Sequence, residues 1–124
     1  MKALSTTAAP AAIGPYSQAI MAGDTVYVSG QLPINPSTGE FAEGGIKEQA
    51  RQSLNNIKNS LAEAGMTMQQ VVKVTVLMTD MSDFAAVNEV YAEFFSAPYP
   101  ARSAFAVAAL PKGGAIEIEA IAVK

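Results

Sequence analysis

The chain has 124 residues, a net charge of −3 and only 15% charged residues, and 50% of its residues are hydrophobic. This length predicts one domain, residues 1–124, with a core large enough to fold without metals or disulfides. The absence of cysteine and histidine excludes thiolate chemistry, cysteine-ligated metals and a serine–histidine triad. The negative charge argues against nucleic-acid binding, and no segment resembles a membrane span or a signal peptide, so we expect a cytoplasmic protein.

Two short strands joined by a tight turn are the first elements that the sequence predicts. Residues 19–21 and 26–29 are rich in strand-forming residues, and the residues between them include Gly23 and Asp24. This pattern is typical of a β-hairpin. Gly30 is expected to end the second strand, and the proline- and glycine-rich residues 32–45 are expected to form a loop.

An amphipathic helix is expected over residues 46–64. Hydrophobic residues recur there every three or four positions, which places them on one helix face. These residues are Ile46, Ala50, Leu54, Ile57, Leu61 and Ala64. Gly65 follows at a position where a left-handed glycine commonly ends a helix.

The rest of the chain predicts a strand, a second helix and two more strands. Residues 71–79 are rich in β-branched side chains, and alternation places Val72, Val74, Val76 and Met78 on one face. Asp80 or Ser82 is expected to cap a helix that ends before the prolines at 98 and 100. Residues 102–107 and 115–123 are the last two predicted strands.

The order of these elements predicts an α+β fold, a mixed β-sheet with two helices packed on one face. The second face of the sheet then has no helix to cover it. Because the chain is also poor in charged residues, we expect copies of the chain to cover this face for one another.

Arg102 is the basic residue whose position most suggests a ligand. It opens a strand of small and hydrophobic residues, so its guanidinium group needs either a protein carboxylate or an anionic ligand. The spacing alone leaves both alternatives open. The other arginine, Arg51, lies on the polar side of the first helix near Lys47 and Lys58, and we interpret it as a solvated surface charge.

Glu117 and Glu119 are two residues apart in the last predicted strand, so they share one face with Ile121 and Val123. They could be charges that protect an exposed strand edge from aggregation. Alternatively, one of them could position a water molecule or move protons. The two glutamates need not have the same role.

Three further positions are candidates because they lie at the ends of elements or inside a helix. Tyr16 follows a Gly-Pro bend, and Ser29 and Gly30 lie where the hairpin is expected to end. Asn88 lies within the second predicted helix, where asparagine is a mediocre helix former. Each could equally be a turn residue or an exposed polar residue.

Taken together, six segments resemble the RidA (YjgF) family, the 2-iminobutanoate/2-iminopropanoate deaminases. The resemblance covers nearly the whole chain, and the segments occur in the family's order. They are Ala9–Gln18, Ser29–Pro33, Gln49–Asn56, Phe84–Asn88, Pro100–Ser103 and Ile116–Ala120.

The resemblance implies a chorismate-mutase-like fold and a homotrimer with three active sites between subunits. It implies that Arg102 binds the substrate carboxylate and that Glu119 orients the attacking water. The other residues that it places in the pocket are Tyr16, Ser29, Gly30, Asn88 and Ala104. Ala104 stands where the family frequently has a cysteine, so only its backbone groups are available.

The implied reaction is the hydrolysis of 2-imino acids, which form from 2-aminoacrylate-type enamines released by pyridoxal-phosphate dehydratases. An imine is already electrophilic, so we expect neither a metal nor a cofactor. One alternative is a non-enzymatic trimer that binds small carboxylates or regulates a partner, which would use Arg102 but has no need for Glu119. A second alternative, RNA cleavage, agrees poorly with the absence of histidine and the negative charge.

Overall fold

The computed structural model describes residues 1–124 and contains six strands, two α-helices and three short 3-10 turns. In chain order the strands and helices are β1 (Lys2–Leu4), β2 (Ala19–Ala22), β3 (Thr25–Gln31), α1 (Ile46–Ala62), β4 (Val71–Met78), α2 (Phe84–Phe94), β5 (Ala101–Ala106) and β6 (Ile116–Val123). No helix of the chain is long and hydrophobic enough to cross a lipid bilayer.

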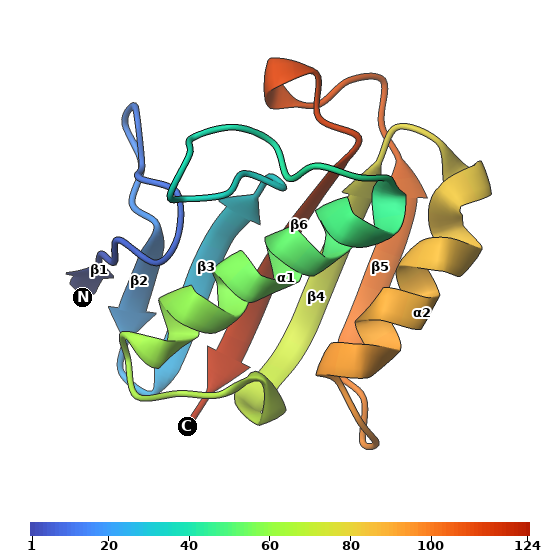
Figure 1. Ribbon diagram of the computed structural model, residues 1–124. Coiled ribbons are helices and arrows are strands. Elements are labelled where there is room, and N and C mark those ends of the chain that lie inside the picture. The colour runs from blue at the N-terminus through green and yellow to red at the C-terminus, as the bar shows by residue number, and fades with distance from the viewer.

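All six strands form one mixed sheet in the order β1-β2-β3-β6-β4-β5. The β4–β5 pair is parallel and the other pairs are antiparallel. Both helices lie on the same face of the sheet, with α1 running across β3, β6 and β4, and α2 beside it over β5 (Figure 1). The expected α+β class and the one-sided packing of the helices are therefore confirmed.

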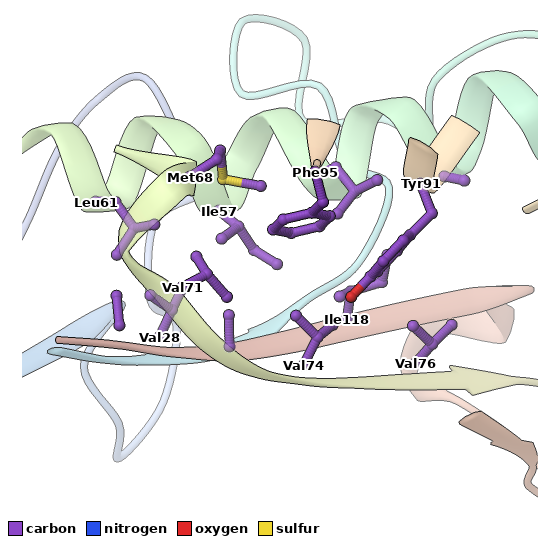
Figure 2. Packing of buried hydrophobic residues seen from close by; sticks show 14 of the residues in the cluster. Val28, Ile57, Leu61, Met68, Val71, Val74, Val76, Tyr91, Phe95 and Ile118 are labelled. Carbon is purple, nitrogen blue, oxygen red and sulfur yellow. The ribbon is translucent and has the colours of Figure 1, made fainter. Parts of the chain in front are cut away.

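The core lies between this helix layer and the sheet. Figure 2 shows Leu61 and Ile57 of α1 above Val28, Val74 and Ile118 of the sheet. The predicted hydrophobic face of α1 is confirmed, because its central members are completely buried. The helix ends at Ala62, and Gly65 has a positive φ of 69° just beyond it.

Leu54 in this face offers a test of the core. Its side chain is completely buried, so Leu54→Ala is expected to lower the free energy of unfolding by about 2–5 kcal/mol through lost burial and a residual cavity. Urea unfolding measures this loss. Lys58→Ala, on the exposed side of the same helix, is the matched control. Equal losses in both variants would contradict the packing described here.

The structure corrects the expected face of Val72. The pairing of β4 with β6 shifts register between Val71 and Lys73. This bulge turns Val71 toward the core and leaves Val72 46% exposed, away from Val74 and the buried residues that follow. Simple alternation fails here because a bulge adds one residue to a strand without adding a partner.

The beginning and end of the N-terminal hairpin also differ from expectation. The sequence predicted no strand before residue 19, but β1 pairs with β2 along the edge of the sheet. Gly30 does not end β3, because the strand continues through it to Gln31. Instead, Gly30 lies where the register between β3 and β6 shifts.

The face of the sheet opposite the helices is open in the single chain, and we call it the open face. It carries two large aromatic side chains, Tyr27 on β3 and Phe105 on β5, which are 50% and 49% exposed. Ile121 of β6 lies opposite Tyr27, and Leu77 of β4 lies opposite Phe105. A hydrophobic surface of this kind on a sheet without a covering layer is typical of an interface.

Candidate functional site

Arg102 lies on the edge strand β5, next to Val74 of the parallel strand β4. Because paired residues in neighbouring strands share a face, Arg102 is on the helix side of the sheet. Its guanidinium carbon lies 4.7 Å from the centroid of the Tyr91 ring and 5.2 Å from that of Phe84. Its Nη1 donates a hydrogen bond to Oδ1 of Asn88, at 2.8 Å.

No carboxylate of the chain pairs with Arg102, since the ion pairs of the chain involve only Lys47 and Arg51 as cations. The alternative in which Arg102 forms a structural ion pair within the chain is therefore wrong. A guanidinium group held between two aromatic rings and one amide keeps most of its donors free. This arrangement fits an anionic ligand, and it brings together two of the predicted residues, Arg102 and Asn88.

A pocket of about 420 Å³ opens beside the guanidinium group. The residues that line it are Asn88, Tyr91, Ala92, Tyr99, Pro100 and Arg102. Tyr91 is buried and its hydroxyl has no hydrogen-bond partner. Burial raises the pKa of Tyr91, and the nearby positive charge of Arg102 opposes that rise. The tyrosine therefore acts as a neutral aromatic support for the guanidinium group.

Ala104 lies two residues further along β5, opposite Val76. It shares the helix side of the sheet with Arg102 and is partly buried against the core. Its side chain carries no polar atom, so only its backbone could serve a ligand.

Glu119 lies on the opposite face of the sheet. It pairs with Thr75 of β4, and its neighbours Ile118 and Ala120 point into the core. Glu119 is exposed and Glu117 is half-buried, both on the open face. The strand-edge interpretation of these glutamates is wrong, because β6 lies in the middle of the sheet between β3 and β4.

Ser29 and Gly30 border the same region of the open face. Between the pairs Val28–Ala120 and Gln31–Ile118, these two residues of β3 face the single residue Glu119 of β6. This is the two-against-one arrangement of a β-bulge, which is common beside active sites. The Ser29 hydroxyl donates to the Ser17 carbonyl at 2.6 Å, which ties the bulge to the preceding loop.

Tyr16 lies in that loop, after Gly14, whose φ is 121°. Its side chain is 53% exposed, and a hollow of about 550 Å³ between Tyr16, Pro36 and the N-terminal residues lies beside it. No contact joins Tyr16 to Arg102 within the chain. The structure places Tyr16 with the Ser29 loop and does not bring it to the Arg102 pocket.

Two buried amide side chains that fix these loops were not predicted. Gln18 donates from Nε2 to the carbonyls of Thr6, Ala9 and Pro10, and its Oε1 accepts from the Thr6 amide. Asn56 of α1 donates to the carbonyls of Leu32 and Ile34. The position of Asn56 within the hydrophobic face of α1, next to Ile57, was the signal that could have identified it.

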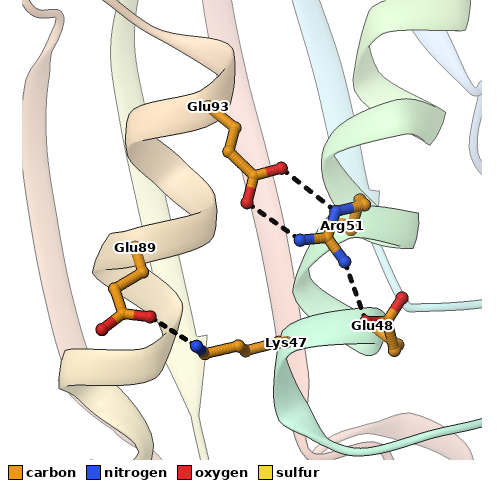
Figure 3. Close-up of polar contacts among 5 residues, drawn as sticks. All are labelled: Lys47, Glu48, Arg51, Glu89 and Glu93. Carbon is orange, nitrogen blue, oxygen red and sulfur yellow. Dashed lines mark hydrogen bonds and ion pairs between the residues drawn. The ribbon is translucent and has the colours of Figure 1, made fainter.

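Arg51, in contrast to Arg102, is fully paired. Figure 3 shows it between Glu48 of α1 and Glu93 of α2, with the neighbouring pair of Lys47 and Glu89. These contacts raise the pKa of Arg51, and the hydrogen bond to Glu93 is the largest cause. Arg51 is still a surface residue, as predicted, but it joins the two helices instead of being solvated alone.

The predicted site residues therefore form two groups on opposite faces of the sheet. Arg102, Asn88 and Ala104 are on the helix side at the β5 edge, and we call them the arginine half-site. Glu119 lies on the open face beside the bulge at residues 29–30, with the Tyr16 loop tied to that bulge, and we call these residues the glutamate half-site. With β4 between the two strands, one chain cannot place Arg102 and Glu119 on the same small ligand.

Comparison with known proteins agrees with the six sequence segments. A family model described as endoribonuclease L-PSP matches residues 6–124. A 2-iminobutanoate/2-iminopropanoate deaminase from Capra hircus is 54% identical over 121 residues, which is 98% of this chain and 88% of the goat protein.

Solved structures show the same fold. E. coli TdcF with bound serine has a TM-score of 0.96 at 47% identity, covering 100% of this chain and 99% of TdcF. RidA from the Antarctic bacterium Psychrobacter sp. PAMC 21119 has a TM-score of 0.96 at 52% identity, covering 100% of both chains. The chain thus belongs to the endoribonuclease L-PSP family, which is the RidA (YjgF) family that its sequence segments predict.

Proposed function

We propose that the chain hydrolyses reactive 2-imino acids to 2-oxo acids and ammonia. The observation that carries this proposal is Arg102, a guanidinium group that has aromatic and amide support but no carboxylate partner in the chain. A small 2-imino acid supplies that carboxylate. Deaminase relatives that are about half identical over nearly the full chain support the same reaction.

In the proposed reaction, Arg102 holds the carboxylate with two parallel N–H···O bonds. Glu119 accepts a hydrogen bond from a water molecule and takes its proton as the oxygen bonds to the imine carbon. Glu119 passes this proton to the nitrogen, and it then accepts the proton of the new hydroxyl group as the carbon–nitrogen bond breaks, the carbonyl forms and ammonia leaves. No oxidant and no covalent nucleophile is needed, and positioning by Tyr16, Ser29, Gly30, Asn88 and the backbone of Ala104 supplies the rest.

The direct test is ammonia release from 2-aminoacrylate generated in the cuvette by a serine dehydratase. Ammonia should form faster with the protein than without it, and treatment with a chelator should leave the added rate unchanged because no metal takes part. We place this activity in the cytoplasm, where the dehydratase would release its short-lived product. An unchanged rate of ammonia release would refute the proposed activity.

We further propose a chorismate-mutase-like homotrimer in which each active site joins the arginine half-site of one chain to the glutamate half-site of the next. Two observations support it: the half-sites lie on opposite faces of one sheet, and the open face exposes Tyr27 and Phe105. Sedimentation equilibrium at micromolar concentration is expected to give a trimer. A monomer would contradict both the assembly and the shared site.

Subunit mixing tests the shared site more sharply. Chains with Arg102→Ala and chains with Glu119→Gln should each be inactive, or nearly so, as pure trimers. In a closed ring, random co-assembly creates one intact site in every mixed trimer, so co-expression should restore about a quarter of wild-type activity per subunit. If each site were formed within one chain, mixing would restore nothing.

The alternative is a non-enzymatic trimer that binds small carboxylates or regulates a partner. It requires Arg102 but gives no reason for the Glu119 carboxylate near a bound anion, because like charges repel. The serine bound to TdcF shows that a relative accepts a small amino acid, so we expect this chain to bind serine as well. Turnover of 2-aminoacrylate then decides between an enzyme and a binding module.

RNA cleavage, which the family description names, is not the function we propose. The chain has a net charge of −3 and no histidine, so it lacks both a basic surface for phosphates and the usual general base. We expect no nucleic-acid partner. A labelled RNA should therefore survive incubation with the trimer under conditions in which 2-aminoacrylate is consumed.

A further inference from the structure

Glu117 is a half-buried carboxyl group that the proposed reaction does not use. On the open face it pairs with Leu77 of β4 on one side, and on the other side its side chain extends diagonally toward Gly30 of β3. Neither neighbour offers a charged or hydrogen-bonding side chain. Glu119 follows two residues later on the same face, so the two Cα atoms are about 7 Å apart.

Gly30 leaves room for this carboxyl group. A Cβ atom built on Gly30 would lie 2.8 Å from both Cδ and Oε1 of Glu117, closer than real Cβ contacts come. The φ of Gly30 is not positive, so backbone conformation does not require glycine at this position. Glycine is required there because the Glu117 carboxyl group approaches so closely.

The Glu117 carboxyl also has no partner in the chain. No hydrogen bond or ion pair of the chain involves it, although the residue is half-buried. Burial, and secondly the charge of Glu119, raise the pKa of Glu117. The other titratable side chains of this face on β3 and β4 are Tyr27 and Lys73, and Lys73 donates to Ser103. A carboxylate in such a position is stabilised by a cation from outside the chain.

The substrate of the proposed reaction carries such a cation. A 2-imino acid in its iminium form is a zwitterion, with a carboxylate at one end and a positively charged nitrogen on the neighbouring carbon. Resting on the imine hydrolysis proposed above, we propose that Glu117 binds this nitrogen, while Arg102 of the adjoining chain binds the carboxylate and Glu119 holds the water. Each charged end of the ligand then meets a group of opposite charge.

The spacing of the groups agrees with this assignment. Two carboxylates about 7 Å apart at their Cα atoms can reach one atom and its neighbour from the same face. In the single chain, Glu119, beside Thr75 and the 29–30 bulge, is exposed, whereas Glu117 is partly shielded by Leu77 and Gly30. The exposed carboxylate suits the water and the shielded one suits a cation, because low dielectric strengthens the attraction.

Equilibrium binding separates this role from a structural one. L-serine has a carboxylate and an ammonium group, whereas 2-oxobutanoate has only the carboxylate. In titration calorimetry on the full-length trimer, Glu117→Gln is expected to weaken serine binding about tenfold or more. Its affinity for 2-oxobutanoate should stay within about twofold of that of the wild type. In steady-state kinetics the same variant should raise KM for the imine more than it lowers kcat.

The pH dependence gives a second readout. A bound ammonium group favours ionised Glu117, so protons and serine compete, and serine affinity should fall as the pH is lowered toward 5. Because the pKa of Glu117 is raised, the fall should begin at a higher pH than for an ordinary glutamate. It should be smaller in Glu117→Gln, which has no carboxyl group at this position.

A double-mutant cycle tests the link to Gly30. Gly30→Ala should displace the Glu117 carboxyl group, which is the end of a flexible side chain. The variant should therefore weaken serine binding more than it weakens 2-oxobutanoate binding. In the Glu117→Gln background it should add no further selective loss for serine. Equal weakening of both ligands, or serine affinity equal to wild type in Glu117→Gln, would overturn the inference. Failure of the wild type to release ammonia would instead refute the proposed reaction, whatever the binding data show.

Discussion

Replacing Arg102 with alanine is expected to abolish ammonia release from 2-aminoacrylate and leave the trimer folded. The side chain lies on the edge strand β5 and is exposed; it contacts two ring faces and one amide but fills no part of the core. Removing this side chain therefore weakens ligand binding strongly but changes the free energy of unfolding little. Activity and sedimentation measured on the same preparation test both halves of this prediction.

The lysine variant separates charge from geometry. Arg102→Lys keeps a positive charge but loses the planar fork that holds a carboxylate by two bonds. Loss of one of two charge-assisted hydrogen bonds should weaken substrate binding about tenfold or more. Binding of 2-oxobutanoate, followed by calorimetry, measures this effect without relying on turnover.

Arg51→Ala is the matched control, because the chain has no third arginine. Arg51 joins α1 to α2 through Glu48 and Glu93 on the protein surface and lies outside both half-sites. Its variant should retain wild-type turnover and ligand affinity. If Arg102→Ala instead unfolds the protein and no small carboxylate protects the wild type, Arg102 is a structural residue.

The helices and strands could be predicted where the hydrophobic residues of a segment followed a single periodicity. Helix α1 presents hydrophobic residues every three or four positions, and the structure buries them as predicted. Asp80 was a predicted cap of the second helix; its carboxylate accepts from the Ser82 amide and caps the 3-10 turn Met81–Asp83 that leads into α2, whereas α2 itself starts after Asp83 without a side-chain cap. Such features depend on local physics, which the sequence contains in full.

The bulges could not be predicted, because they depend on pairing between distant strands. Nothing local distinguishes Val72 from Val74, yet a register shift against β6 exposes Val72 and leaves Val74 completely buried. Gly30 looked like the end of a strand, and only its approach to Glu117 explains why it is glycine. The strand order that moved Glu117 from an expected edge to the centre of the sheet is likewise a long-range property.

The candidate site was predicted as a list of residues but not as an arrangement. Alternation within β5 and within β6 fixes the face of each side chain relative to its own strand, and pairing through β4 fixes the two strands relative to each other. Only the pairing of both strands with β4 places Arg102 and Glu119 on opposite faces of the sheet. It turns a set of expected pocket residues into two half-sites that need a second chain.

Glu119→Gln is expected to lower kcat by about 10²–10⁴-fold, the usual contribution of general-base assistance. Glutamine has nearly the shape of glutamate but cannot take the proton of the attacking water. Affinity for pyruvate or 2-oxobutanoate should hold or improve, because a negative charge near the bound carboxylate is gone. This pairing of slow turnover with intact binding distinguishes an enzyme from a carboxylate-binding module, in which Glu119 has no part in turnover.

Glu63→Gln is the control for this experiment, since Glu63 is an exposed residue at the end of α1. Its variant should match the wild type in kcat and in product affinity. Glu119 is exposed in the middle of the sheet, beside Thr75 and the 29–30 bulge, so its replacement leaves the core intact. A Glu119→Gln trimer with wild-type turnover would mean that backbone groups alone place the water, and that Glu119 only keeps the open face charged.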